Sequence, residues 1–528
     1  MDILLKGGHI LDGTGTPAFD ANVGVVGDMI SYIGSGEPEA DNVLDITGLC
    51  LCPGFIDAHA HSEFTLMADG RAEAKIAQGV TTEINGNCGL SAAPLSGQAA
   101  VRREADMLEY GITERWSSFG EYFSLLSQKG IGINFATLCG HGNLRGSVFG
   151  YADGMPDPEQ MSAMRQLAQS SVKEGIAGLS TGLIYPPGIF SDTDEIAELC
   201  RIFADMDGVY ASHMRSEGEM LLESLQEMID IAYISGIRIH VSHLKTYGME
   251  NWHKADAAID MLRKGIDSGL RITCDRYPYT AAGTDLDAIL PGWAHEGGIE
   301  EEMRRLQSPQ SRSKIEEELR QRAQDIGGAY WQGIVISSVS RPESAWMEGW
   351  SISDISSKLG IRPEEAVVDI VISEHARASA HFFVMCEENL RKFLSLPFAM
   401  IGSDSSARSF SGPTCIGRPH PRAFGSFPRF LGRYARDENM FSLEEAVRKI
   451  TGLPAETFRL TRRGAVREGF YADLTVFEYS TISDRSTYND PYVRPEGIAH
   501  VFVNGKSALS HGSLTGMLGG RIIKTGNI

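Results

Sequence analysis

Between residues 53 and 460, short apolar runs alternate with helix-like patterns, and this alternation constrains the fold most. The apolar runs lie at 80–84, 133–138, 177–180, 209–212, 237–242, 272–274, 333–336 and 399–402. Helical periodicity fills segments between them, such as 220–235 and 255–268. About eight strand-then-helix units of this kind predict an α/β fold with a (β/α)8 TIM-like barrel, in which reactive side chains collect at the carboxyl ends of the strands.

Both ends of the chain have a different pattern. Residues 1–52 contain short strand-like runs separated by turn signals, Gly7-Gly8 and Asp12-Gly13, with no helix-length periodicity. Strand-like runs return at 469–477 and 498–505. We therefore predict a small β-sandwich domain built from 1–52 together with 460–528, beside a barrel that spans 53–459.

One charged segment does not fit a strand-then-helix unit. Residues 285–345 contain helical stretches at 300–305 and 313–325. We interpret the segment as an insertion between barrel strands that could act as a lid over the active site. The alternative is a solvent-exposed helical segment that has no role at the active site.

Composition excludes several classes of protein. With a formal net charge of −21 over 528 residues, the chain lacks the basic surface of a general nucleic-acid binder. The N-terminus shows no signal-peptide pattern, and no apolar run approaches the roughly 20 residues of a membrane span. The eight cysteines are scattered without framework spacing, which favours free thiols in a reducing cytoplasm.

The sequence His59-Ala60-His61 follows an apolar run and ends it with two imidazoles. In an extended chain, side chains i and i+2 point to the same side, so both rings could bind one metal ion. The alternative is two unrelated polar residues at the junction between a strand and a loop.

Four more polar residues follow strand-like runs: Cys88, His213, His243 and Asp404. In a closed parallel barrel these ends converge at one mouth, and the combined set could hold one or two metal ions with a position left for water. Taken singly, each residue would more often be structural. His141 also ends a strand-like run and is the main rival ligand, whereas His240 lies inside a run and is interpreted as a core residue.

Such a centre predicts a hydrolytic reaction. A divalent cation lowers the pKa of bound water from 15.7 to about 7, and a nearby carboxylate can take the proton of that water and return it to a leaving amine. Asp404 is placed for that role. We therefore expect metal-assisted hydrolysis of an amide or a similar bond.

The chain resembles the amidohydrolase superfamily, and within it the D-aminoacylase (N-acyl-D-amino-acid deacylase) branch. The motifs that carry the resemblance are PGFIDAHAH at 53–61, GNCG at 86–89, STGLIYPPG at 180–188, SHLK at 242–245, YPYTA at 277–281, PGWA at 291–294, GSD at 402–404, HPRAFG at 420–425, TGLPA at 451–455 and EGFYADL at 468–474. Cys88 is the most telling residue, because many superfamily members bridge two metals with a carboxylated lysine and this branch offers a cysteine instead.

The resemblance implies a zinc enzyme that converts an anionic N-acyl-D-amino acid into a carboxylate and a free D-amino acid. Cys88, His213 and His243 would hold a tightly bound zinc. His59, His61 and Asp404, sharing Cys88, would form a second, weaker site, with Asp404 as general base and acid.

The resemblance also implies a set of substrate-binding residues: Lys245, Tyr277, Arg422 and Tyr185. Tyr279 is an equal candidate for the role of Tyr277 when the residue types alone are considered. The loop 405–419, which contains Arg408 and Arg418, is longer than the resemblance leads us to expect, so the acyl and side-chain preferences stay open.

Three alternatives to the deacylase remain. Two stay in the superfamily: a cyclic amide hydrolase of the dihydroorotase or hydantoinase kind, and a peptidase that acts on D-residues. The third is a barrel that has lost catalysis and serves as a scaffold, against which the intact set of candidate ligands argues.

Overall fold

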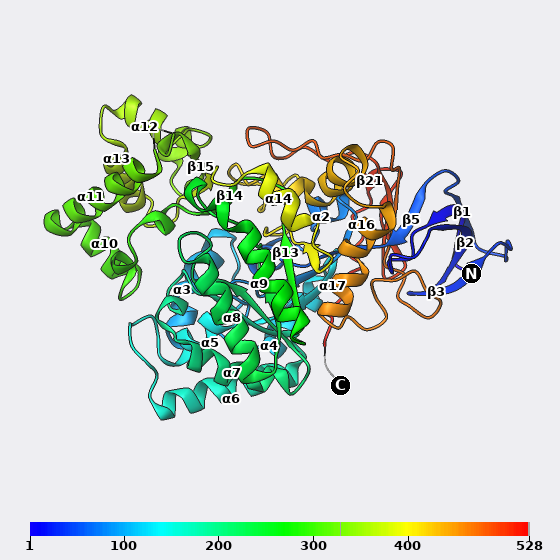
Figure 1. Cartoon of the computed structure of the whole chain (residues 1–528). Coiled ribbons are helices and arrows are strands. Elements are labelled where there is room, and N and C mark those ends of the chain that lie inside the picture. Colours follow the sequence, from blue (N-terminus) through cyan, green and yellow to red (C-terminus); the bar gives the residue numbers. More distant parts are fainter. Residues whose placement is uncertain (328, 526–528) are drawn as a thin grey trace.

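The computed structural model describes residues 1–327 and 329–525. Parallel strands run through its centre in a six-stranded sheet, ordered β17-β13-β12-β11-β10-β9, and a three-stranded sheet, ordered β6-β7-β8 (Figure 1). Their bounds are β6 Phe55–Asp57, β7 Val80–Asn85, β8 Asn134–Thr137, β9 Cys139–Gly140, β10 Gly178–Gly182, β11 Val209–His213, β12 Arg238–Val241, β13 Ile272–Arg276 and β17 Ala399–Ile401.

Backbone hydrogen bonds join the two parallel sheets at both of their edges. Only Leu138 separates β8 from β9, and its N–H donates to the carbonyl of Asn85 at 2.9 Å. On the other side, Ala58 N–H donates to the carbonyl of Ile401 at 3.2 Å. The carboxyl ends of the parallel strands therefore lie together, where the sequence placed its polar residues.

Helices follow most of these strands. The predicted helices at 220–235 and 255–268 appear as α8 and α9. The helices along this part of the chain are α1 Glu63–Ala68, α2 Glu73–Ala77, α3 Gly97–Glu109, α4 Phe119–Lys129, α5 His141–Val148, α6 Pro158–Glu174, α7 Thr193–Ala204, α8 Leu221–Ser235, α9 Ala255–Asp267, α14 Glu387–Leu394, α15 Arg422–Arg429, α16 Leu443–Ile450 and α17 Gly452–Thr457.

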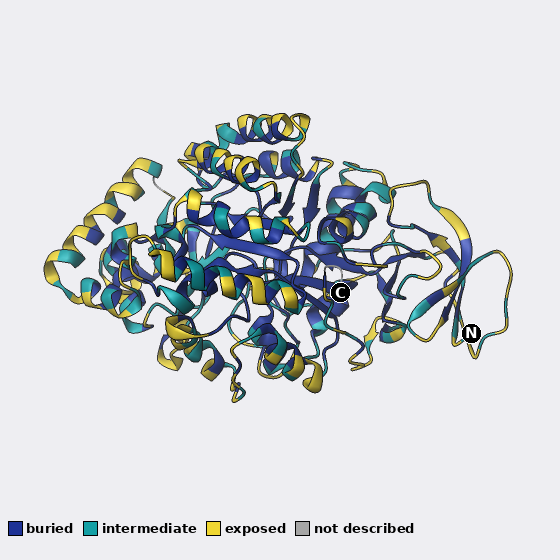
Figure 2. Ribbon diagram, turned by 90° about the horizontal axis from the view of Figure 1, so that it is seen from below, coloured by how far each residue is buried: buried dark blue, intermediate teal, exposed yellow. Residues whose placement is uncertain are grey.

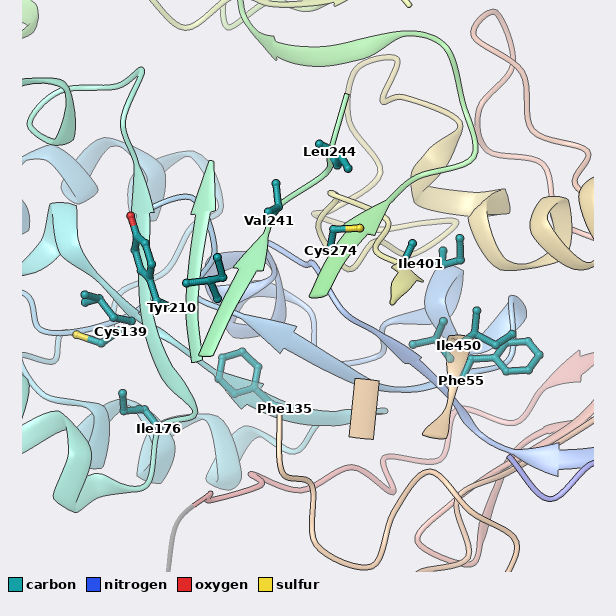
Figure 3. Packing of buried hydrophobic residues seen from close by; sticks show 14 of the residues in the cluster. Phe55, Phe135, Cys139, Ile176, Tyr210, Val241, Leu244, Cys274, Ile401 and Ile450 are labelled. Atoms are coloured by element: carbon teal, nitrogen blue, oxygen red, sulfur yellow. The ribbon is translucent and has the colours of Figure 1, made fainter. Parts of the chain in front are cut away.

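Local sequence explains where these helices begin and end. In α6, the Asp157 side chain accepts hydrogen bonds from the backbone N–H groups of Glu159 and Gln160, Pro158 occupies the first turn, and Gly175 ends the helix in the left-handed region. The helices expose their outer faces and bury the faces that pack on the central strands (Figure 2). Figure 3 shows the apolar packing between those strands, with Tyr210, Val241 and Cys274 on neighbouring ones.

Strands from the two chain ends share one nine-stranded sheet, in which β18 pairs antiparallel with β5. The strands are β1 Ile3–Ile10, β2 Phe19–Val26, β3 Met29–Gly34, β4 Asn42–Asp45, β5 Cys50–Pro53, β18 Leu474–Phe477, β19 Ile498–Val503, β20 Lys506–Ser510 and β21 Ser513–Leu514. Only Gly54 separates β5 from β6, and a Cβ there would lie 2.2 Å from Thr81 Oγ1. The sheet of the chain ends thus leads directly into the strand that carries His59.

The chain between β13 and β17 forms a distinct unit at one end of the molecule (Figure 1). It contains an antiparallel sheet of β14 Ala282–Asp285, β15 Ile334–Ser338 and β16 Ser379–Phe382, and the helices α10 Ile299–Gln307, α11 Pro309–Ile326, α12 Ile352–Leu359 and α13 Pro363–Ser373. Its own hydrophobic cluster runs from Tyr277 to Met385, well beyond the predicted limit of 345.

The apolar run at 333–336 was predicted among the strand-then-helix units, and this prediction is wrong. The run lies in β15, which pairs antiparallel with β16 inside this unit, with Val335 opposite His381. A short apolar run looks the same in a parallel and in an antiparallel sheet, so periodicity could not separate them.

All eight cysteines are free thiols. Within the described part of the chain, no helix is both long enough and apolar enough to cross a membrane.

The carboxylate of Asp473 links the sheet of the chain ends to β8. It pairs with Arg463 in a buried ion pair and accepts a hydrogen bond from Asn134 Nδ2 at 3.1 Å. Replacing Asp473 with Ala leaves the Arg463 cation buried and uncompensated, so we expect a loss of about 3 kcal/mol of stability. A lower midpoint of urea denaturation would show it. The exposed Asp490→Ala serves as control, and equal midpoints for the two variants would contradict the prediction.

Candidate metal and substrate site

The residues predicted for the site gather at one large cavity of about 1740 Å³. The cavity is lined by His61, Cys88, Tyr185, His213, His243, Lys245, Tyr277, Asp404 and Arg422. His59 lies fully buried behind the wall, beside Cys88. These residues lie at or after the carboxyl ends of parallel strands, so those ends do converge at the cavity. The strands are β6, β7, β10, β11, β12, β13 and β17.

The first group of candidate ligands consists of Cys88, His213 and His243, whose donor atoms lie within 4.8 Å of one another. Cys88 Sγ is 3.5 Å from His243 Nε2. His213 Nε2 is buried and has no hydrogen-bond partner among the described residues. A buried polar atom without a partner is costly, and a metal ion would satisfy it.

The second group consists of His59, His61 and Asp404 and shares Cys88 with the first. Asp404 Oδ1 lies 3.5 Å from His59 Nε2 and 3.3 Å from His61 Nε2. Cys88 Sγ lies 3.3 Å from His59 Nε2. Both groups therefore meet at one sulfur atom.

The backbone holds three of these candidate ligands in the left-handed region. The φ angles are 53° at Cys88, 36° at His243 and 50° at Asp404. Non-glycine residues there cost about 1–3 kcal/mol each and persist where the surrounding structure imposes them, often at functional sites. Gly86 and Gly89, with φ of 73° and 74°, allow the tight loop that points Cys88 inward.

The donor set suits zinc or a similar borderline metal: one thiolate, four imidazoles and one carboxylate. Burial would raise the pKa of the Cys88 thiol, but His59 and His243 lower that pKa well below its usual value. The thiolate, which is the form that binds metal, is thereby favoured.

Two buried carboxylates orient the candidate ligands from behind. Asp275 Oδ2 lies 3.1 Å from His59 Nδ1 and 2.9 Å from His240 Nε2. Glu217 Oε1 lies 2.8 Å from His243 Nδ1. A carboxylate on the far nitrogen of a ligating histidine fixes the ring and its tautomer.

Neither carboxylate was predicted, although the sequence contained a signal for each. Asp275 directly follows the apolar run 272–274, and Glu217 comes four residues after His213. Neither residue belongs to a motif that carries the family resemblance.

The predicted substrate-binding residues differ in their present partners. Lys245 pairs with Glu217, and Arg422 Nη1 lies 2.9 Å from Asp404 Oδ2. The Tyr277 hydroxyl is buried without a hydrogen-bond partner in the described chain, and the Tyr185 hydroxyl lies 3.0 Å from Thr284 Oγ1.

The surroundings of Tyr277 affect its acidity. Burial would raise the pKa of the phenol, but the cations of Lys245, Arg276 and Arg422 bring that pKa below its ordinary value. A more acidic hydroxyl is a better hydrogen-bond donor to an anion.

The alternative residues point elsewhere. Tyr279 Oη lies 3.3 Å from Asp484 and does not line the cavity. His141 Nε2 lies 2.7 Å from Glu195 Oε1 in a buried hydrogen bond, away from the candidate ligands. His240 is a core residue held by Thr273 and Asp275, as its position inside a strand predicted.

Two segments outside the parallel strands complete the cavity wall. Arg322 and Tyr330 reach it from the unit between β13 and β17, and Arg408 and Gly417 reach it from the loop 405–419. Arg418 N–H donates to the carbonyl of Ser337 at 2.7 Å, which joins the loop to β15. Both segments thus face whatever enters the cavity.

A family model described as the amidohydrolase family matches residues 42–312 and 358–508. The chain belongs to the amidohydrolase family. Within it, the chain is 33% identical to a D-aminoacylase of Alcaligenes xylosoxydans xylosoxydans over 99% of its own length and 97% of that protein. An N-acyl-D-glutamate deacylase of the same organism is 31% identical, covering 96% of this chain and 93% of the relative.

Solved structures agree with these relatives. A crystal structure of D-aminoacylase has a TM-score of 0.81 at 32% identity, covering 99% of both chains. An N-acyl-D-glutamate deacylase from Bordetella bronchiseptica, complexed with zinc and a phosphonate mimic of the tetrahedral intermediate, has a TM-score of 0.82 at 30% identity, also covering 99% of both chains. A dihydropyrimidinase at 14% identity and a TM-score of 0.58 shares the fold alone.

The predicted membership of the D-aminoacylase branch is confirmed by these matches. So is the predicted class of enzyme, a hydrolase of carbon–nitrogen bonds in linear amides. The match is nearly full-length, so it covers both the sheet of the chain ends and the cavity.

Glu217 should control metal affinity through His243. Replacing it with Gln removes the charge that orients the imidazole, and we expect the affinity for zinc to fall by about 10- to 100-fold. Competition with a chromophoric chelator measures this. The exposed Glu223→Gln on α8 is the matched control, and equal affinities for the two variants would contradict the assigned role.

Proposed function

We propose that this protein is a zinc-dependent N-acyl-D-amino-acid deacylase. The reaction takes an N-acyl-D-amino acid and water to a carboxylate and a free D-amino acid. The observation that carries the proposal is the meeting of two ligand groups at Cys88, inside a cavity that also presents Arg422 and Tyr277. The near-full-length similarity to D-aminoacylase supports the same reaction.

Cys88, His213 and His243 would hold the tightly bound zinc, and His59, His61 and Asp404 would form the weaker second site with Cys88. Bound zinc would supply hydroxide at neutral pH and polarise the scissile carbonyl. The first group is more deeply buried, whereas the side chain of His61 is 27% exposed. Arg422 also pairs with the Asp404 carboxylate, which lowers the affinity of the second group for a metal ion.

Asp404 acts as general base and then as general acid. Burial would raise the pKa of its carboxyl, but Arg422, His243 and His61 bring that pKa well below the usual value. The carboxylate is therefore ionised and can accept a proton from the attacking water. It later returns this proton to the nitrogen of the leaving D-amino acid.

Arg422, Lys245 and Tyr277 bind the anionic end of the substrate and the oxygen of the scissile carbonyl. The Tyr277 hydroxyl has no competing hydrogen bond in the described chain, so it can donate to an oxyanion without losing an existing partner. Tyr185, whose ring centroid lies 5.2 Å from that of His213, lines the wall beside the metal ligands.

We extend the proposal to the domain arrangement. The joined parallel strands form one (β/α)8 barrel over 53–459, the two chain ends form a β-sandwich domain from 1–52 and 460–528, and the segment predicted at 285–345 belongs to a lid over the cavity. Arg322 and Tyr330 on the cavity wall support the lid. Lys245 and Arg422 on the cavity wall support a small anionic substrate. The free thiols support a location in the cytoplasm, and the acidic net charge argues against a nucleic-acid partner.

A panel of N-acetyl-D- and N-acetyl-L-amino acids, assayed for released amine with and without added zinc, tests the function. We expect hydrolysis of D-substrates only, and a fall in kcat of about 100- to 10,000-fold in Asp404→Asn, because the proton acceptor is lost. Equal rates on both enantiomers would refute the stereochemistry. Hydrolysis of hydantoins or dihydroorotate instead would indicate a cyclic amide hydrolase.

The two ligand groups should differ in zinc content. His213→Ala and His243→Ala should lose more zinc than His59→Ala and His61→Ala, because the first group holds the tighter ion. Zinc per chain after gel filtration, measured by mass spectrometry, gives the answer. Equal losses in all four variants would show that the sites do not differ in affinity.

A further inference from the structure

A second cluster of metal-ligating residues lies outside the cavity, in the unit between β13 and β17. It consists of Asp287, His295 and Glu302, whose donor atoms lie within 4.8 Å of one another. Asp287 belongs to the 3-10 helix η3 Leu286–Ile289, His295 to the 3-10 helix η4 Gly292–His295, and Glu302 to α10. None of the three lines the cavity described above.

The contacts inside this cluster leave acceptors unused. His295 Nδ1 lies 2.8 Å from Glu302 Oε2. The other oxygen, Glu302 Oε1, is buried without a hydrogen-bond partner in the described chain, in a residue that is only 4% exposed. In the same part of the chain, the half-buried Asp287 carboxylate has neither a side-chain hydrogen bond nor an ion pair. A buried carboxylate oxygen such as Glu302 Oε1 is costly unless a donor or a cation faces it.

Hydrogen bonds to the backbone fix His295 and Glu302 toward each other. Gly298 N–H donates to the carbonyl of His295 at 3.1 Å, and Glu302 N–H donates to the carbonyl of Gly298 at 3.0 Å. Arg305 Nη1 donates to the carbonyl of Ala294 at 3.0 Å. These bonds turn the chain between η4 and α10 so that His295 faces the first turn of the helix.

We propose that Asp287, His295 and Glu302 form a structural zinc site, separate from the centre at Cys88. One imidazole and two carboxylates are ligands that zinc accepts, with water as a fourth. Binding at His295 Nδ1 would replace the hydrogen bond to Glu302 Oε2, release any proton on that nitrogen to solvent, and satisfy the free Glu302 Oε1. The ion would thereby fasten η3, η4 and α10 to one another.

The site would stiffen one wall of the cavity. Ile289, Gly298 and Ile299, which lie within four residues of the three ligands, line the cavity. A cation that links the short helices would hold this wall in place without contacting the substrate. The proposal does not depend on the reaction that the Cys88 centre catalyses.

Metal counting tests this site. The holoenzyme is stripped with a chelator, reloaded at a buffered micromolar free zinc concentration, desalted, and analysed for zinc per chain by mass spectrometry. We expect His295→Ala and Asp287→Asn each to bind one zinc fewer than the wild type. The exposed His253→Ala, outside the cluster, should match the wild type.

Cobalt separates the two centres, because only the Cys88 centre can give a thiolate-to-metal charge-transfer band. In His295→Ala and Asp287→Asn the cobalt count should fall by one per chain while this band keeps its intensity. An unchanged metal count in both variants would overturn the proposal, as would a band that weakens in step with the count. Asp287→Asn preserves side-chain size, so it decides the matter if His295→Ala aggregates.

Discussion

The placement of the Cys88 sulfur is the constraint on which the rest of the site depends. Two groups of imidazoles approach this atom, within 3.3 Å at His59 and 3.5 Å at His243. The loop can present the thiol only because Gly86 and Gly89 adopt left-handed conformations on either side of it. Since a Cβ at Gly89 would come within 2.7 Å of the backbone nitrogen of Gly182, the close approach of β10 to this loop also requires glycine.

The buried charged groups around the Cys88 sulfur are paired with groups of opposite charge or with histidines. Asp275 and Glu217 hold the far nitrogens of the candidate ligands His59 and His243. Lys245 pairs with the same Glu217, and Arg422 pairs with Asp404. Burying any of these charges without its partner would be strongly unfavourable. The same arrangement therefore stabilises the mouth of the cavity and fixes the orientation of the rings that would bind metal.

The residues at strand ends could be predicted from the sequence, because the carboxyl ends of the parallel strands of a barrel lie together at one cavity. Cys88, His213, His243 and Asp404 are far apart in the chain, yet each lies at or just after the end of a strand that the apolar pattern had indicated. His59 follows β6, a three-residue strand that the pattern did not separate from the apolar run before it. The carboxylates behind them were missed because a hydrogen bond to the far side of an imidazole leaves no periodic pattern. The unit between β13 and β17 was only partly predicted, since its sheet is antiparallel and draws β16 from beyond the expected limit.

Arg422 pairs with Asp404, the proposed base, and it is also the residue proposed to bind the substrate carboxylate. In the described structure, Arg422 Nη1 holds Asp404 Oδ2 at 2.9 Å and helps keep the pKa of that carboxyl low. A substrate anion that takes part of this guanidinium would weaken the pair and raise the pKa of Asp404. A carboxylate with a higher pKa is a stronger base, so under the proposed roles substrate binding itself would prepare Asp404 to accept the proton of water.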